Sequence, residues 1–245
     1  MYVTGAGPAV VVMAEMPGIS PRVPRFARWV RDAGFTVWMP SLFGQDGAVP
    51  TVSAGKEVLA RACVAREFRA LAGGEPAPIA RWLRALAHVA HLQCGGRGVG
   101  AVGMCFTGSF ALSMMLEPSV LAPVLCQPSL PLQQPAGLQH SPTELALVRR
   151  RLEAEDLTAL AFRFAGDAFC RAERFAAYQE ALGARFVARV LPDETAGPRS
   201  ARPDDFFQLI PTPHSVVTVH LVDEAGQPTA AARDEILAFL RQRLR

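Results

Sequence analysis

The sequence lacks the patterns that mark membrane-spanning and exported proteins. No apolar stretch reaches the roughly 18 residues that a transmembrane helix needs. The N-terminus shows no basic segment followed by an apolar run and a small-residue cleavage site. The five cysteines, an odd number, have no CxxC pair and no other metal-ligand spacing. We therefore expect a cytoplasmic protein in a reducing compartment, with no metal site and no contact with a membrane.

Lysine is almost absent, and the remaining charge is scattered. Lys56 is the single lysine among 25 basic residues, and 22 acidic residues reduce the net charge to +3. The arginines are spread through expected helices, which favours solvated helix faces over a nucleic-acid surface. No G-x-G-x-x-G follows the first expected strand and no P-loop is present, so neither a dinucleotide nor a nucleoside triphosphate is indicated. We expect no cofactor and no nucleic-acid partner.

Apolar runs of strand type alternate with segments of helical periodicity along the whole chain. With 245 residues, 50% of them apolar, and no internal repeats, we expect one domain over residues 1–245 with a large core. The expected strands cover residues 9–14, 35–39, 99–104, 121–126, 159–165 and 186–191. The expected helices cover residues 23–33, 56–72, 79–92, 106–116, 143–155, 171–182 and 229–244. This alternation predicts an α/β fold in which helices cover both faces of a mainly parallel sheet.

Several connecting segments show no clear periodicity. Residues 45–55 and 127–142 carry turn formers and are expected to be loops. Residues 192–213, rich in Pro, Asp and Arg, form an unusually long connection for a compact domain, and such connections are often functional loops or lids. Residues 216–222 fit either an edge strand or an apolar loop.

The run from Gly98 to Leu112 takes the chain directly from a strand into a helix at Cys105. Such a turn strains the backbone of its central residue, projects that side chain, and requires small neighbours two positions away. Gly103 and Thr107 meet this requirement. The amides and the dipole of a following helix would favour a thiolate. We interpret Cys105 as a nucleophile; the alternative is a packed cysteine, because cysteine is among the most buried residue types.

A cysteine nucleophile needs a base, and the base needs a group that orients it. Asp167 and His214 follow Cys105 in the order nucleophile, acid, histidine that α/β-hydrolase topology uses, each in a loop after a strand. His220 is the competing base, since it also follows the last clear strand. Asp193 is the competing acid, but Asp167 directly follows the strand that should carry the acid. The sequence therefore favours Cys105, His214 and Asp167.

An ordered set of short motifs resembles the dienelactone hydrolase family of α/β hydrolases. The matching segments are Glu15-Met16-Pro17-Gly18, Pro40-Ser41-Leu42-Phe43-Gly44, Gly103-Met104-Cys105-Phe106-Thr107-Gly108, Ala165-Gly166-Asp167 and His214-Ser215. Only the cysteine turn is specific by itself. The resemblance implies an α/β-hydrolase fold and a carboxymethylenebutenolidase-like hydrolase of ester bonds, with no metal or organic cofactor.

The resemblance also implies a role for each matching residue. Cys105 would attack the ester carbonyl, His214 would act as base and then as acid, and Asp167 would hold the imidazole. The backbone amides of Met16 and Phe106 would form the oxyanion hole, which stabilises developing charge.

Glu15 would correspond to an additional acid of the family, which contacts the resting thiol. Thr107 stands where the family commonly has glycine, which would narrow the space near the oxyanion, and the first strands would be reduced to residues 2–4 or be missing. Family members bind an acidic lactone with arginines, and Arg199 and Arg202 of the long loop are the weak candidates for that task.

The sequence thus predicts a hydrolase of a small-molecule carboxylic ester or lactone, with dienelactone-type substrates as the specific prediction, acting as a monomer or homodimer. Two other classes stay open. In a thiol-based redox protein, Cys105 would be oxidised and resolved by another cysteine such as Cys170. A non-catalytic binding protein would keep the fold alone, but an intact nucleophile, acid and base argue against it.

Overall fold

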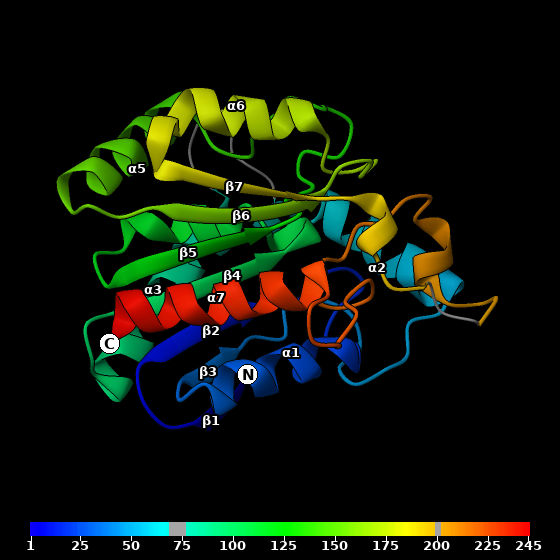
Figure 1. The fold of residues 1–245 in the computed structure, drawn as a ribbon, viewed down its shortest axis with the longest axis horizontal. Helices are drawn as coiled ribbons and strands as arrows, with labels where there is room; N and C mark the ends of the chain where they lie inside the picture. Colours follow the sequence, from blue (N-terminus) through cyan, green and yellow to red (C-terminus); the bar gives the residue numbers. More distant parts are fainter. Residues whose placement is uncertain (69–76, 199–201) are drawn as a thin grey trace.

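A computed structural model describes residues 1–68, 77–198 and 202–245 (Figure 1). Within these residues the strands form one sheet in the order β1-β3-β2-β4-β5-β6-β7. The strands are β1 Tyr2–Gly5, β2 Ala9–Met13, β3 Thr36–Met39, β4 Val99–Met104, β5 Val120–Cys126, β6 Ala159–Phe164 and β7 Phe186–Leu191. Only β1 is antiparallel to its neighbour; the other pairs are parallel. The expected α/β fold is confirmed.

Helices cover the sheet on both sides. They are α1 Arg22–Asp32, α2 Val52–Val64, α3 Pro78–Cys94, α4 Phe110–Ser113, α5 Pro142–Ala154, α6 Ala172–Leu182 and α7 Pro228–Leu244. The helices α1 and α7 pack on one face, and α3, α5 and α6 on the other (Figure 1). The helix α2 lies past the carboxyl ends of the strands, where ligands of parallel sheets bind (Figure 1).

The central strands β2, β4 and β5 carry no polar or charged side chain because both of their faces are covered. In β2, Val10 and Val12 pack toward α1 and α7, whereas Val11 and Met13 pack toward the opposite helices. Gly100 in β4 permits a close approach of α7, since a Cβ there would lie 2.6 Å from Leu240 Cδ2. The sheet is therefore a rigid support for the loops at its carboxyl edge.

The helix α2 departs from the sequence prediction. It begins at Val52 and not at residue 56, because Thr51 caps it by accepting a hydrogen bond from the amide of Ala54 at 3.3 Å. The helix ends at Val64, and the last part of the expected helix, residues 69–72, lies outside the described residues.

The structure also decides between the alternatives that the sequence left open for the first strand and for residues 216–222. The edge strand β1 is present, over four residues. Residues 216–222 form a buried apolar loop and not an edge strand; within it the amide of His220 donates to the carbonyl of Ser215 at 3.0 Å. The long connection after β7 contains short 3-10 turns at Asp193–Thr195 and Phe206–Leu209. In the described part of the chain, no helix has the length and apolar character needed to cross a membrane.

Candidate active site

Cys105 directly follows β4 in a strained backbone conformation. Its φ of 53° lies in the left-handed region, which residues with a side chain rarely adopt. Gly103 allows the chain to fold back, because a Cβ there would lie 2.3 Å from the carbonyl oxygen of Thr107. The strained turn that the sequence predicted is present, and Cys105 lines a cavity at the carboxyl edge of the sheet.

The helical segment after this turn runs to Leu116, as the sequence predicted, but it is irregular. The 3-10 turns Cys105–Thr107 and Met114–Leu116 lie on either side of α4, which covers the four residues Phe110–Ser113. Its macrodipole is therefore smaller than that of a regular α-helix of this length.

Thr107 does not narrow the space near the oxyanion, contrary to the sequence prediction. Its side chain is fully buried, and Oγ1 accepts the amide hydrogen of Met104 at 3.0 Å. The same hydroxyl lies 3.1 Å from the carbonyl oxygens of both Met13 and Ala14, to which it can donate. Thr107 thus ties the cysteine turn to the end of β2, two residues before Met16.

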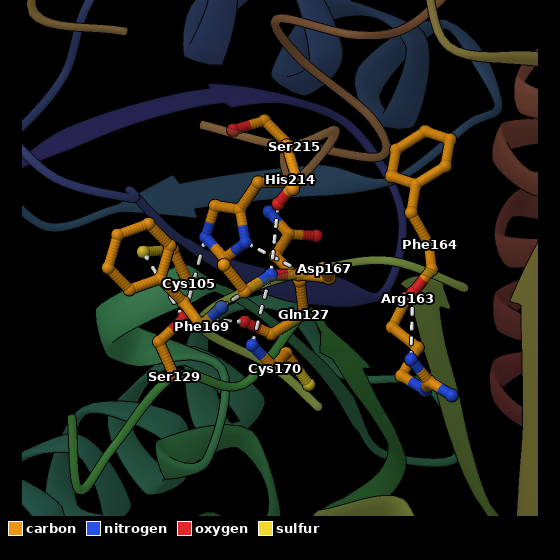
Figure 2. Close-up of polar contacts among 12 residues, drawn as sticks. Cys105, Gln127, Ser129, Arg163, Phe164, Asp167, Phe169, Cys170, His214 and Ser215 are labelled. Carbon is orange, nitrogen blue, oxygen red and sulfur yellow. Dashed lines mark hydrogen bonds and ion pairs between the residues drawn. The ribbon is translucent and has the colours of Figure 1, made fainter. Parts of the chain in front are cut away.

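His214 and Asp167 form a buried pair. His214 Nδ1 lies 2.7 Å from Asp167 Oδ2, and both side chains are essentially inaccessible (Figure 2). The other carboxylate oxygen accepts the amides of Phe169 at 2.9 Å and Cys170 at 3.0 Å. Because Nδ1 donates to the carboxylate, the other ring nitrogen, Nε2, lies on the side of the imidazole that faces Cys105 (Figure 2).

The charges around His214 favour its protonated form. Burial alone lowers the pKa of the imidazole, but the neighbouring Asp167 and Cys105 raise it, and the net result is a pKa well above the ordinary value of a histidine. A positively charged imidazolium next to the sulfur would stabilise a thiolate there.

Ser129 is a polar contact of this site that the sequence analysis did not identify. Its Oγ lies 3.5 Å from Cys105 Sγ, 3.4 Å from His214 Nε2 and 3.0 Å from the carbonyl oxygen of Gln127, and its single hydrogen can be donated to one of these atoms at a time (Figure 2). Its position could have suggested this role, because Ser129 follows the strand β5. The strand β5 pairs with β4, so both strand ends meet at the same edge of the sheet.

The two competing residues of the sequence analysis support the site without touching the thiol. His220 Nδ1 accepts the amides of His214 at 3.2 Å and Ser215 at 3.1 Å, so it holds the backbone of the histidine loop. Asp193 Oδ1 accepts the amide of Gly166 at 2.8 Å, just before the acid. Among the described residues, neither side chain lines the cavity at Cys105.

Glu15 is buried and lines the cavity, but its hydrogen-bond partners differ from those the resemblance implied. Its carboxylate accepts from Ser215 Oγ at 2.6 Å and from Thr218 Oγ1. Burial raises the pKa of Glu15, and the two hydroxyl donors partly oppose that shift. Within the described residues, no hydrogen bond joins Glu15 to Cys105; the carboxylate instead fixes the loop that follows His214.

The match to a family model covers this architecture as far as the loop after β5. The model of the dienelactone hydrolase family matches residues 3–141, more than half of the chain. The chain belongs to the dienelactone hydrolase family. It is accordingly a hydrolase that acts on ester bonds, as the sequence predicted. The matched region includes the cysteine turn, whereas Asp167 and His214 lie beyond it.

Solved structures share the fold of this dienelactone hydrolase family member at low sequence identity. The dienelactone hydrolase-like promiscuous phosphotriesterase P91, from metagenomic libraries, has a TM-score of 0.61 and 16% identity, over 97% of this chain and 87% of that one. A cold-adapted esterase from an Arctic intertidal metagenomic library has a TM-score of 0.55 and 14% identity, over 99% and 85%. A Pyrococcus furiosus esterase has a TM-score of 0.51 and 11% identity, over 98% and 83%. None of the curated proteins matches the chain.

In this family member, a fully buried arginine joins the two loops that flank the cysteine. Arg174 donates all of its guanidinium hydrogens to main-chain carbonyls. The acceptors are Gly137 at 3.0 Å, Pro128 and Phe169 at 2.9 Å, and Pro131 and Gln134 at 2.7 Å. Arg174 therefore clamps the loop that carries Ser129 to the loop that carries Asp167.

Arg202, one of the two arginines predicted to bind substrate, does not lie at the cavity. Arg202 is half exposed and pairs with Asp204 at 3.1 Å, and it is not among the described residues that line the cavity. Arg199 lies outside the described residues. The residues predicted for the oxyanion hole, Met16 and Phe106, both line the cavity next to Cys105.

Proposed function

We propose that this chain hydrolyses a carboxylic ester or lactone through Cys105, His214 and Asp167, by way of an acyl-enzyme. The observation that carries the proposal is the buried 2.7 Å pair of His214 and Asp167, with the other side of the imidazole directed at a cysteine on a strained turn (Figure 2). These are the three groups that nucleophilic acyl transfer requires.

In acylation, the thiolate of Cys105 forms a bond to the carbonyl carbon, and the carbonyl oxygen becomes an oxyanion. The amides of Met16 and Phe106 donate to that oxyanion, at positions that Thr107 fixes through its bonds to β2. The imidazolium of His214 then gives its Nε2 proton to the departing alkoxide, which leaves as an alcohol.

In deacylation, a water molecule gives a proton to Nε2 of His214 while its oxygen attacks the thioester carbon. The bond from carbon to sulfur then breaks, the carboxylic acid product leaves, and Cys105 regains its thiolate beside the imidazolium. Asp167 remains ionised throughout and holds the ring through Nδ1.

The redox alternative is less well supported by the surroundings of Cys170. This residue is fully buried, and burial raises the pKa of its thiol well above the ordinary value. A resolving cysteine acts as a thiolate, so a protonated, inaccessible thiol is a poor candidate.

Hydrolysis of p-nitrophenyl acetate by wild type, Cys105→Ala and Cys63→Ala tests the proposal. We expect kcat/KM of Cys105→Ala to fall by at least about 10³-fold. The covalent acetyl adduct, detected by mass spectrometry in wild type, should be absent from this variant. Cys63 is exposed and serves as the matched control, with unchanged turnover. Ester hydrolysis that survives in Cys105→Ala would contradict the assignment. A dienelactone assayed beside the aryl ester shows whether the acidic lactone is a substrate.

A further inference from the structure

The lining of the cavity at Cys105 indicates which substrates it accepts. Resting on the proposed function, we propose that the substrate presents a compact, uncharged, apolar acyl group to Cys105, and that a carboxylate on the acyl chain is rejected.

Apolar side chains dominate the wall opposite the sheet and extend around the nucleophile. The apolar lining residues are Met16, Leu59, Phe106, Leu132, Phe169, Phe206, Phe207, Leu209 and Ile210. They come from α2, from residues 206–210 and from the loops after β2, β4, β5 and β6. Such a lining gains free energy from an apolar ligand and offers few hydrogen-bond partners to a polar one.

The outer part of this wall is a fixed structure. The amide of Phe206 donates to the carbonyl of Pro50 at 3.0 Å, and the amide of Val52 donates to Asp204 at 2.7 Å. The Phe206 ring lies directly on Gly55 of α2, where a Cβ would come within 2.1 Å of the ring. The apolar surface is therefore held against the cysteine by main-chain bonds and by close packing.

The charges that line the cavity are unfavourable for an anionic acyl group. Glu15 contributes a buried carboxyl group, which offers no positive charge to an anionic acyl group. Two lining side chains can carry positive charge: His214, which is already paired with Asp167 at 2.7 Å, and Lys56, which is exposed to solvent on α2. An acyl carboxylate in this cavity would lose its hydration without gaining an unpaired buried cation, which is costly.

Two described arginines beside the apolar wall, Arg22 and Arg202, already have partners. Arg22 lies 3.8 Å from Asp205 and 5.5 Å from the centre of the Phe207 ring, on the wall but outside the cavity lining. Arg202 pairs with Asp204. These contacts leave the apolar surface itself facing Cys105.

The cavity is also small. It encloses about 110 Å³, whereas a cavity of about 150 Å³ is known to accommodate benzene. An acyl group of about four carbons fits, and a longer chain would have to pass the rim. Leu132 and Leu209 form part of that rim, with exposed fractions of 36% and 41%.

Alkylation of Cys105 by iodoacetamide and by iodoacetate tests the charge preference without any ester. In both reagents the sulfur displaces iodide from the same methylene carbon, so they differ mainly in charge. We expect Cys105 to prefer the neutral reagent by a ratio at least ~30-fold larger than the ratio at the exposed Cys63 of the same chain. Equal ratios, or faster reaction of iodoacetate at Cys105, would overturn the inference.

A pair of aryl esters tests the same preference in turnover. We expect p-nitrophenyl butyrate to exceed p-nitrophenyl hemisuccinate by at least ~30-fold in kcat/KM. In Leu209→Arg, a new cation at the rim should lower the ratio of butyrate to hemisuccinate kcat/KM by about fivefold, as expected for one partly screened charge. Leu92→Arg, at an exposed position on α3, is the control and should leave the ratio unchanged.

The two experiments separate the two proposals. If Cys105 shows the neutral preference in alkylation but neither ester is hydrolysed, the proposed function fails and the apolar site stands. If both esters are hydrolysed equally well in a Cys105-dependent manner, the proposed function stands and the inference fails. A hemisuccinate preference that disappears in Lys56→Met would assign the cavity to anionic substrates and overturn the inference.

Discussion

The cavity at Cys105 has two walls that are built on different principles. The sheet-edge wall, formed by Cys105, Ser129 and His214, comes from loops after strands, and hydrogen bonds hold its side chains at distances of 2.7 to 3.5 Å. The cap wall, formed by Leu59 and residues 206–210, is held by packing and by the isolated bridge between Thr51 and Asp205. The comparison shows that polar side chains held by hydrogen bonds are gathered in one wall and apolar side chains in the other; in our proposals the first supplies the chemistry and the second the selectivity.

The largest effect is expected from the base. His214→Ala removes both the proton carrier and the partner of Asp167, so kcat/KM should fall by about 10³ to 10⁴-fold. Leu209→Ala, in the cap wall, should change kcat/KM for an uncharged ester by less than about 10-fold. Steady-state kinetics on p-nitrophenyl butyrate measures both. Similar losses of kcat/KM in the two variants would contradict the assignment of different roles to the two walls.

His220 refines this comparison, because it holds the histidine loop without reaching the thiol. We expect His220→Ala to lose about 10-fold in kcat/KM, in proportion to two lost backbone hydrogen bonds. His220→Asn should recover most of that loss, since its amide oxygen can accept the same main-chain hydrogens. A loss in His220→Ala as large as that in His214→Ala would assign the base to His220.

Arg174 stabilises the sheet-edge wall from behind. Arg174→Met leaves buried carbonyls without donors, so the free energy of unfolding should fall by at least ~3 kcal/mol in urea denaturation. Arg149→Met is the matched control: Arg149 is an exposed i,i+4 partner of Glu153, and its loss should cost about 0.5 kcal/mol. Equal stability of the two variants would show that the clamp contributes nothing.

Ser129 should have an intermediate effect on the chemistry. Its hydroxyl can donate to the thiolate of Cys105, and hydrogen bonds to charged groups contribute about 1.5–3 kcal/mol, so Ser129→Ala should lose about 10 to 100-fold in kcat and in the rate of Cys105 alkylation. Ser20→Ala is the control, because Ser20 is buried with no hydrogen-bond partner for its Oγ. If alkylation in Ser129→Ala proceeds at the wild-type rate, the hydroxyl does not act on the sulfur.

The smallest effect concerns the titration of His214. Cys105→Ser removes one of the groups that raise the pKa of His214, so the pKa measured by NMR of the imidazole should fall but stay above the ordinary value, because Asp167 remains. The raised pKa also means that the pair stabilises the fold below about pH 6.5, the unfolded value, and that this contribution fades as pH rises through the folded value. An unchanged His214 pKa in Cys105→Ser would show that the sulfur does not affect the titration of the imidazole.

Part of the sheet-edge wall could be predicted because Cys105 directly follows an apolar run, and Asp167 and His214 lie in the connections after later strands. In a parallel sheet, the end of every such run lies at the same edge, so Cys105, Asp167 and a histidine after the last strand had to converge. The sequence prediction missed Ser129 for a different reason. A serine among prolines and glutamines is a common loop residue, and only the pairing of β5 with β4 brings it to the sulfur.

Errors in the prediction arose where long-range contacts decide the outcome. Thr107 was expected to narrow the oxyanion space, but carbonyls of β2, more than 90 positions away in sequence, accept its hydroxyl. Glu15 lines the same cavity as Cys105, but the hydroxyls that bind its carboxylate lie about 200 residues away in sequence. The helix after Cys105 ends at Leu116 as predicted, but 3-10 turns replace regular α-helix at both of its ends.

The sequence by itself determined the α/β architecture, the strained cysteine turn and the positions of Cys105, Asp167 and His214 in loops after strands, because hydrophobic periodicity and turn composition are local properties. Only the tertiary structure decided how His220, Arg174 and Ser129 hold the site, and which side chains close it. Those contacts join segments far apart in the chain, and their geometry depends on packing that no local pattern encodes.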